Sequence, residues 1–314
     1  MRSGDHLRTL SDDVHFQATL LRGWDQDYVQ LQAGRFQGSV NTFGNGPVKL
    51  FSERMNCSTF QMGALPEGHL AFGLPIRAAG YSLICGEEGD RNSLLVFSGR
   101  AGFEFRAPGD FEFLGIEIAP EGASDPVFRA LTRTLAGNLA SGRRAIRLDS
   151  RSAGKFGRQL RTVLAGDAVR DMLDDEDRAL AFNRGLVGWI LDMLPSQTAA
   201  PDRQPVRHWE AIMDIRRLVS DSPLCPLSVA ELTEETGLSR RTLQSACQQT
   251  VGLSPVQYLR ALRLSEARRA LGRSGSVTEA ATQYGFWHLG YFARDYRAMF
   301  GELPSETLLR RRLA

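Results

Sequence analysis

The sequence predicts an α+β fold with two domains: an N-terminal antiparallel β-barrel or jelly roll and a C-terminal domain made of helices. Three observations support this division: the length of 314 residues, short apolar runs separated by glycines in the first part, and a helical unit that occurs twice near the end. We expect residues 1–124 to form the barrel and 125–195 a helical segment. Residues 196–206 should be a linker, and 207–314 the helical domain.

The predicted barrel begins near residue 18. Apolar and aromatic residues form short alternating or continuous runs up to residue 118, and glycines interrupt them. Strands with this spacing are typical of antiparallel barrels and jelly rolls. The expected strands include 28–33, 48–51, 70–74, 93–97 and 111–118.

A ligand pocket in the predicted barrel cannot be identified from the sequence. Its aromatic residues are candidates for the lining, although ordinary core is the better expectation for most of them. These residues are Trp24, Tyr28, Phe36, Phe43, Phe72, Phe103 and Phe105.

Catalysis by a bound metal is not expected. An open iron or manganese site needs several converging nitrogen and oxygen ligands. Of the five histidines, only His69 lies well inside the predicted barrel. The cysteines, Cys57, Cys85, Cys225 and Cys247, have the spacing of neither a zinc site nor a disulfide framework. We therefore predict no catalytic residue, no metal and no cofactor.

The helical segment contains one long amphipathic helix, predicted over residues 177–194. Leu180, Val187, Leu191 and Leu194 fall on one stripe of this helix. The barrel of the same chain is one possible partner for the stripe. The polar stretch that follows, bounded by Pro195 and Pro205, is typical of a linker between domains.

The first copy of the repeated unit begins at Ser228. A glutamate follows three residues later, which is the spacing of a capping box, and Gly237 stands where a helix would end at positive φ. Ser239 can cap a second helix, on which Leu243 and Cys247 face the core. Two helices around such a turn form a helix-turn-helix. The outward-facing side chains of its second helix are Arg240, Arg241, Gln244, Ser245 and Gln248.

The second copy repeats this pattern. Gly285 follows Gly237 by 48 residues, but Phe292 follows Leu243 by 49, so the second copy has one extra residue after its turn. Phe292 and Tyr296 take the core positions, and Arg294 and Arg297 face outward. Between the copies, residues 258–271 contain no glycine or proline and predict a helix about 20 Å long. Such a helix could hold two recognition helices about one DNA turn, roughly 34 Å, apart.

The two predicted recognition helices differ in chemistry. Arginine pairs with guanine and glutamine with adenine in the major groove, so the first helix can discriminate bases. The second begins with Trp287, His288 and Leu289. Two interpretations of Trp287 and Leu289 remain open, contact with sugars and thymine methyl groups or a place in the core, and His288 could donate to a phosphate or base. The predicted DNA-binding residues are Ser239, Arg240, Arg241, Gln244, Ser245, Gln248, Trp287, His288, Arg294 and Arg297.

Charge gives modest support to a nucleic-acid partner. Residues 207–314 contain 15 arginines, no lysine and 11 acidic residues, which gives a net charge of +4, and the rest of the chain carries −2. A positive domain favours contact with phosphates. A charge of this size requires that specificity come from individually placed side chains.

The order of these motifs resembles a known family. The run Gly252-Leu253-Ser254-Pro255, the helix starting at Tyr258-Leu259, the pair Gly285-Phe286 and the final Gly301 and Pro304 are similar to the AraC/XylS family of bacterial transcription regulators. The resemblance covers about residues 207–310. Residues 285–308 resemble, more narrowly, a subgroup that includes regulators of ethanolamine catabolism.

The resemblance implies a DNA-binding domain with two modules and an N-terminal, cupin-like barrel that binds a small-molecule effector. It also implies a homodimer, which gives the stripe of residues 180–194 its second interpretation as a subunit interface, and RNA polymerase as a further partner. The expected function is therefore a ligand-responsive transcription regulator, and more specifically an activator. The alternatives are a cupin-type metalloenzyme fused to a DNA-binding domain and a constitutive architectural DNA-binding protein.

The chain contains no apolar stretch of the roughly 18–20 residues needed to span a bilayer, and its start lacks the apolar core of a signal peptide. The sequence therefore predicts a cytoplasmic protein without a membrane partner, located on the nucleoid when it is bound to DNA.

Overall fold

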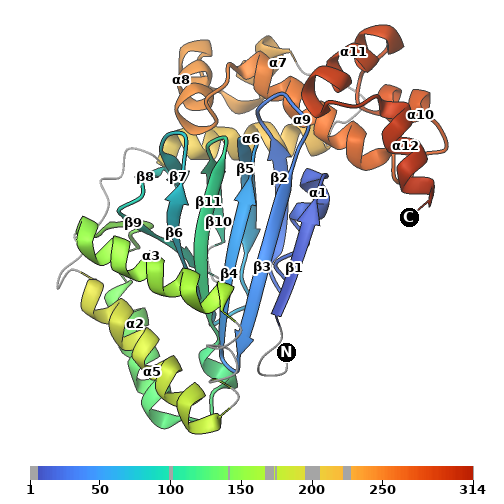
Figure 1. Ribbon diagram of the computed structural model, residues 1–314. Coiled ribbons are helices and arrows are strands. Elements are labelled where there is room, and N and C mark those ends of the chain that lie inside the picture. Colours follow the sequence, from blue (N-terminus) through green and yellow to red (C-terminus); the bar gives the residue numbers. More distant parts are fainter. Residues whose placement is uncertain are drawn as a thin grey trace.

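A computed structural model describes residues 6–98, 102–140, 142–166, 173, 175–194, 206–221 and 228–313. Figure 1 shows strands in the N-terminal part, helices α2, α3 and α5 along one side of them, and a group of helices from the C-terminal part at one end. The predicted α+β class is correct.

The strands form two antiparallel sheets. The larger sheet has the order β1 (His6–Ser11), β3 (Gly38–Asn45), β4 (Val48–Met55), β11 (Phe111–Ile118), β6 (Leu70–Arg77), β9 (Ser93–Ser98), β12 (Ala145–Arg147). The smaller sheet has the order β2 (Asp25–Gln30), β5 (Thr59–Ala64), β10 (Phe103–Ala107), β7 (Ser82–Ile84), β8 (Glu87–Gly89). Among the described residues, the predicted barrel or jelly roll is thus a pair of sheets, which we call the N-terminal sandwich.

Aromatic rings fill the space between the two sheets. Phe97 of the larger sheet and Phe103 of the smaller one have ring centroids 4.9 Å apart, and Trp24 packs edge-on against Phe51 and Phe103 at 5.6 Å. Burial of such rings removes much apolar area from water. All seven aromatic candidates for a pocket lining are buried, which makes them core residues, as expected for most of them.

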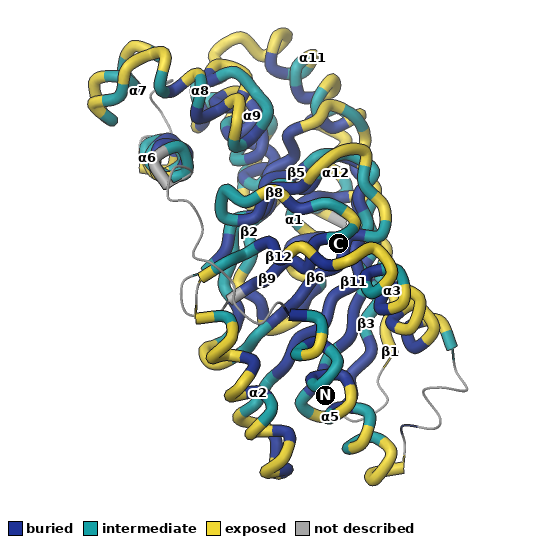
Figure 2. Tube along the Cα trace, turned by 90° about the vertical axis from the view of Figure 1, so that its left-hand side faces the viewer, coloured by how far each residue is buried: buried dark blue, intermediate teal, exposed yellow. Residues whose placement is uncertain are grey.

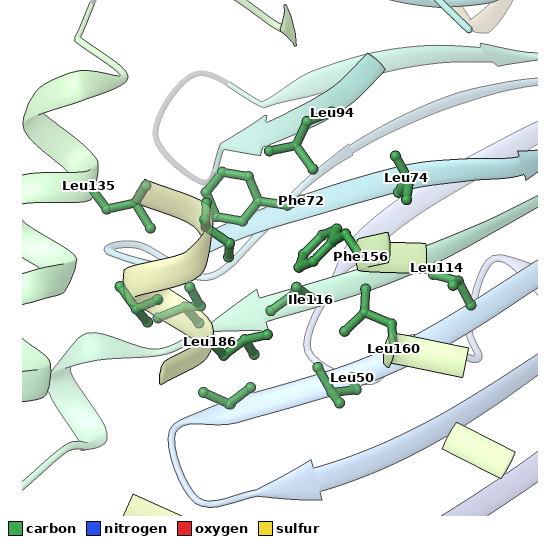
Figure 3. Packing of buried hydrophobic residues seen from close by; sticks show 14 of the residues in the cluster. Leu50, Phe72, Leu74, Leu94, Leu114, Ile116, Leu135, Phe156, Leu160 and Leu186 are labelled. Carbon is green, nitrogen blue, oxygen red and sulfur yellow. The ribbon is translucent and has the colours of Figure 1, made fainter. Parts of the chain in front are cut away.

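The opposite face of the larger sheet is covered by helices. They are α2 (Pro126–Asn138), α3 (Ser150–Ala165) and α5 (Glu176–Met193). Figure 3 shows Phe156 and Leu160 of α3 pointing at Leu50, Leu114 and Ile116 of the sheet. Because both faces of this sheet are buried at its centre, strands β11, β6 and β9 have long apolar runs. Neighbouring residues such as Leu94 and Leu95 belong to different cores.

The stripe predicted on 177–194 packs inside its own chain. Val187 and Leu194 are buried in the cluster that also contains Leu50 and Leu114, and Leu191 packs against it. Of the two interpretations of the stripe, the burial of Val187 and Leu194 supports packing on the sandwich. A subunit interface in this segment stays a prediction.

The remaining elements of the N-terminal part are α1 (Val14–Gln17) and the short 3₁₀ helix η1 (Pro120–Gly122). Helix α6 (Val206–Asp221) begins at the last residue of the predicted linker, while linker residues 196–205 lie outside the described residues. The domain boundaries stay predictions. In the described part of the chain, no helix is both long and apolar enough to cross a bilayer.

Candidate nucleic-acid interface

The first module follows the predicted capping pattern. Helix α7 (Val229–Thr236) begins with a capping box, in which the Ser228 hydroxyl accepts a hydrogen bond from the Glu231 amide and the Glu231 carboxylate accepts one from the Ser228 amide. The helix ends at Gly237, whose φ of 65° lies in the left-handed region that glycine adopts without strain. Ser239 then caps helix α8 (Arg240–Thr250) by accepting a hydrogen bond from the amide of Thr242.

One face of α8 is buried and the other is open. Leu243, Ala246 and Cys247 pack in the core of the module. Among the predicted DNA-binding residues, Ser245 is half-buried and accepts a hydrogen bond from Gln249, and the hydroxyl of Ser239 serves the cap. The exposed side chains are Arg240, Arg241, Gln244 and Gln248.

The second module repeats this arrangement. It consists of helices α10 (Val277–Gln283) and α11 (Leu289–Phe300). Phe292 and Tyr296 are buried, as predicted, while Arg294 and Arg297 are exposed. The N-cap of α11 is His288, whose exposed side chain makes no capping hydrogen bond. Ser239 and His288 are therefore equivalent N-caps. The Ser239 side chain accepts a hydrogen bond from its own helix, whereas the His288 side chain makes no such bond.

The question left open for Trp287 and Leu289 is decided by their exposure. Trp287 is 61% exposed and Leu289 is 40% exposed, so neither is a core residue. Tyr291, which was not among the predicted site residues, is 62% exposed on the same turn of α11. Its position one residue before the core residue Phe292 is the only signal in the sequence that could have indicated this exposure.

Helix α9 (Pro255–Ala270) joins the two modules. At about 1.5 Å per residue it is roughly 24 Å long. Arg260 of α9 forms an ion pair with Asp295 of α11, which fixes the second recognition helix against the linker helix. Figures 1 and 2 show α8 and α11 at the end of the molecule that faces away from α2 and α5. In Figure 2 much of their surface is exposed.

The sandwich docks directly on the helices that carry this surface. Val29 and Phe60 of the smaller sheet, and Leu31 directly after β2, belong to the same hydrophobic cluster as Tyr258 and Leu259 of α9. The hydrophobic core of the first module therefore extends onto the smaller sheet of the sandwich. The second module has a separate core around Phe292 and Tyr296.

Charged residues surround this docked contact. Arg268 of α9 pairs with Asp13, with 3.0 Å between Nη2 and Oδ2, and with Glu302, with 2.7 Å between Nη1 and Oε1. Arg311 of α12 (Pro304–Leu313) also contacts Asp13, at 3.1 Å. Burial alone would raise the pKa of Asp13, but the guanidinium groups of Arg268 and Arg311 hold this pKa well below its usual range. Asp27 of β2 pairs in a similar way with Arg216 and Arg269.

His15 lies between the sandwich and α9. Its Nε2 atom is 3.2 Å from the carbonyl oxygen of Ser265, and its Nδ1 atom is 3.2 Å from Nη2 of Arg269. This arrangement suits a neutral imidazole that donates from Nε2 and accepts at Nδ1. Burial and the nearby Arg269 lower the pKa of His15 to about 4. These contacts have no local signal in the sequence, because His15 and Ser265 are 250 residues apart.

His69, the histidine inside the predicted barrel, contacts a carboxylate. His69 Nδ1 lies 2.8 Å from Glu117 Oε1, and the other oxygen of Glu117 accepts a hydrogen bond from Trp24. Among the described residues, no three His, Cys, Asp or Glu side chains gather as metal ligands. His69 also lines an open cleft of about 940 Å³ beside η1 and α2. Its lining includes Glu67, Leu70, Glu121, Arg129, Thr132 and Arg133.

The C-terminal part of the chain matches known proteins. Residues 232–310 match a family model described as a helix-turn-helix domain. The chain is 41% identical over 87 residues to a probable thc operon regulatory protein of Rhodococcus erythropolis, which covers 26% of each chain. It is 38% identical over 101 residues to XylDLEGF operon transcriptional activator 3 of Pseudomonas putida, covering 31% of this chain and 30% of the relative. The chain thus spans between a quarter and a third of the length of these curated relatives.

A solved structure covers the same region. It is described as a probable AraC family transcriptional regulator from Rhodopseudomonas palustris CGA009, and it is 40% identical to this chain with a TM-score of 0.30. The match spans 32% of this chain and 97% of the other. The narrower resemblance to ethanolamine regulators stays a prediction. The C-terminal part of this chain is thus a helix-turn-helix domain of the AraC type, similar to those of the operon regulators named above.

Proposed function

We propose that this protein is a transcription regulator that binds two successive major-groove segments of double-stranded DNA. The observation that carries the proposal is the pair of exposed recognition helices, α8 and α11, at equivalent places in the two repeated modules. Arg240, Arg241, Gln244 and Gln248 give the first helix donors and acceptors that can pair with base edges. The relatives from Pseudomonas putida are named as transcriptional activators, which supports activation as the direction of control.

Selection of DNA from a random pool by the full-length protein tests this function. We expect enrichment of a motif with two blocks about one helical turn, roughly 34 Å, apart. Binding that lacks any enriched motif and weakens uniformly with salt would instead indicate a non-specific architectural protein, because phosphate contacts alone carry no sequence information.

The proposal includes a small-molecule effector that binds the N-terminal domain. Aromatic side chains occupy the interior of the sandwich, whereas the cleft beside η1 and α2 is open and carries the cations Arg129 and Arg133 one helical turn apart. We therefore place effector binding in this cleft. A ligand can change activity only if it binds two arrangements of the protein with different affinity. The genes next to the enriched DNA sites indicate which compounds should be tested as effectors. Arg133→Ala should remove the response to the active compound, and Arg151→Ala on α3 is the control.

A cupin-type metalloenzyme is the less well-supported alternative. His69 is engaged with Glu117, and both curated relatives described above are regulators. Metal analysis of the purified protein separates the two functions, because stoichiometric iron or manganese would favour the enzyme.

The remaining parts of the proposal concern partners and location. We expect a homodimer that uses a surface other than the buried stripe of α5, RNA polymerase as the partner in activation, and a cytoplasmic protein on the nucleoid. Sedimentation of the full-length protein measures the oligomeric state, and a monomer at all concentrations would remove the dimer from the proposal.

A further inference from the structure

The second module contains one residue that the first lacks, and the structure identifies it as Trp287. The left-handed glycines Gly237 and Gly285 are 48 residues apart, whereas the N-caps Ser239 and His288 are 49 apart. Leu238 packs against the core of the first module and Phe286 against that of the second, so these two residues are equivalent. Trp287 is therefore an insertion between the turn and the recognition helix.

The insertion adds to an exposed apolar surface formed by Trp287, Leu289 and Tyr291, which we call the apolar surface of α11. The three side chains are 61%, 40% and 62% exposed. Three large apolar side chains exposed within residues 287–291 leave much apolar area in water, which indicates a binding partner. They lie at the N-terminal end of α11, which is the end that contacts base edges in helix-turn-helix proteins.

The charges around the apolar surface of α11 fit a nucleic acid. The guanidinium carbon of Arg294 lies 5.1 Å from the centroid of the Tyr291 ring. The side chain of Arg294 is 68% exposed and pairs with Asp295, with 3.4 Å between Nε and Oδ1. Arg297 is exposed one turn further along the helix. An apolar centre bordered by arginines matches the major groove, where phosphates flank the methyl groups of thymine.

The first turn of α11 offers few groups that could discriminate bases by hydrogen bonds. With the N-caps aligned, Leu289 takes the place of Arg240 and Gly290 that of Arg241. The second module therefore has a leucine and a glycine where the first module has the two arginines that could pair with guanine. The C5-methyl group of thymine is the apolar feature that distinguishes bases in the major groove.

We propose that Trp287, Leu289 and Tyr291 recognise thymine methyl groups in the DNA block that faces the second module, while the first module recognises its block by hydrogen bonds. This inference rests on the proposed function and specifies the chemistry of one half of the site.

The test replaces thymine by deoxyuridine, which removes only the methyl group, in one block of the enriched DNA site at a time. The full-length protein should bind about fourfold more weakly for each buried methyl group removed from the block of the second module. The same replacement in the other block should leave affinity unchanged. Leu289→Ala and Trp287→Ala should weaken binding to thymine-containing DNA and reduce the difference between thymine and deoxyuridine. Tyr81→Ala, an exposed aromatic on the sandwich, is the matched control.

Three results would overturn the inference while the proposed function stands. One is equal affinity for thymine and deoxyuridine in the block of the second module. Another is an enriched block there that contains no thymine. The third is a Trp287→Ala variant that binds DNA normally but fails to activate transcription, because the surface would then contact a protein. If no DNA motif is enriched at all, the proposed function itself fails.

Discussion

Arg268 of α9 and Asp13, the N-cap of α1, form an ion pair across the contact between the two domains. The distance between Arg268 Nη2 and Asp13 Oδ2 is 3.0 Å, and the two side chains are only 3% and 10% exposed. The carboxylate of Asp13 also accepts hydrogen bonds from the amides of His15 and Phe16. The Asp13 side chain thus caps α1 and also binds α9, the helix that joins the DNA-binding modules.

Replacement of this carboxylate should destabilise the protein strongly. Asp13→Ala removes the cap of α1 and leaves Arg268 with Glu302 as its remaining carboxylate. Loss of a cap costs about 1 kcal/mol, and removal of one partner of a buried ion pair about 3–5 kcal/mol. Because Glu302 still contacts Arg268, we expect a loss of about 3 kcal/mol in the free energy of unfolding, measured by urea denaturation. Asp149→Ala removes the exposed cap of α3 and should cost only about 1 kcal/mol. Equal losses in the two variants would contradict this account of Asp13.

His15 should make the protein less stable in mild acid. Its pKa is lowered from 6.5 to about 4 by burial and by Arg269. Between these two values the unfolded chain binds more protons than the folded one, so stability falls as the pH falls through this window. Thermal unfolding between pH 7 and pH 4.5 should therefore show a steeper loss for the natural protein than for His15→Gln. His288→Gln, at an exposed position, should keep the natural slope, and a His15→Gln variant with that same slope would disprove the prediction.

Glu53 should act in the opposite direction. This buried carboxyl group accepts hydrogen bonds from Gln17 and Tyr28, but burial raises its pKa from 4.5 to about 7. The folded state then binds more protons than the unfolded chain between these values, and stability falls as the pH rises. The free energy of unfolding of Glu53→Gln should gain roughly 2–3 kcal/mol relative to the natural protein between pH 4.5 and pH 8. Glu88→Gln, at an exposed position, should show no such gain, and a pH-independent difference for Glu53→Gln would exclude this titration.

Variants of the recognition helices should separate specific from general DNA contacts. Arg241→Ala or Gln244→Ala should reduce discrimination in one half of the enriched site by about 1–3 kcal/mol, because these side chains face the base edges in the proposed complex. Arg297→Ala should weaken binding to all sequences alike, as expected for a phosphate contact. Binding assays with matched and mismatched sites distinguish the two outcomes. A uniform loss from Arg241→Ala and Gln244→Ala would show that another face of α8 meets the bases.

Local signals in the sequence predicted the helical modules well. Ser228, Gly237 and Ser239 determine helix ends through interactions within a few residues, and each has its predicted role in the structure. The core positions of α8 and α11 followed from helical spacing. Trp287 could not be assigned in this way, because an insertion in a turn interrupts the spacing on which such predictions depend.

Strands and long-range contacts were harder to predict. The run 111–118 has the bounds of β11 because it is apolar on both faces, whereas the more polar strands β3 and β5 were not identified. The contacts of Asp13 and His15 with α9 join residues about 250 positions apart. The spacing of residues in a single sequence does not indicate contacts between positions this far apart. The contact between the domains is therefore found only in the structure.

Helix α1 provides a second link between the sandwich and the DNA-binding helices, beside the docked contact of Val29 and Phe60 with α9. Gln17 at one end donates to Glu53 inside the sandwich, at 2.9 Å, and Asp13 at the other end is bound by Arg268 and Arg311. A helix of four residues is about one turn, so its two ends lie only about 6 Å apart. We expect a rearrangement inside the sandwich that displaces Gln17 to shift the carboxylate of Asp13, which α9 and α12 contact. The position of α9 between the two recognition helices would then depend on the packing of the sandwich interior.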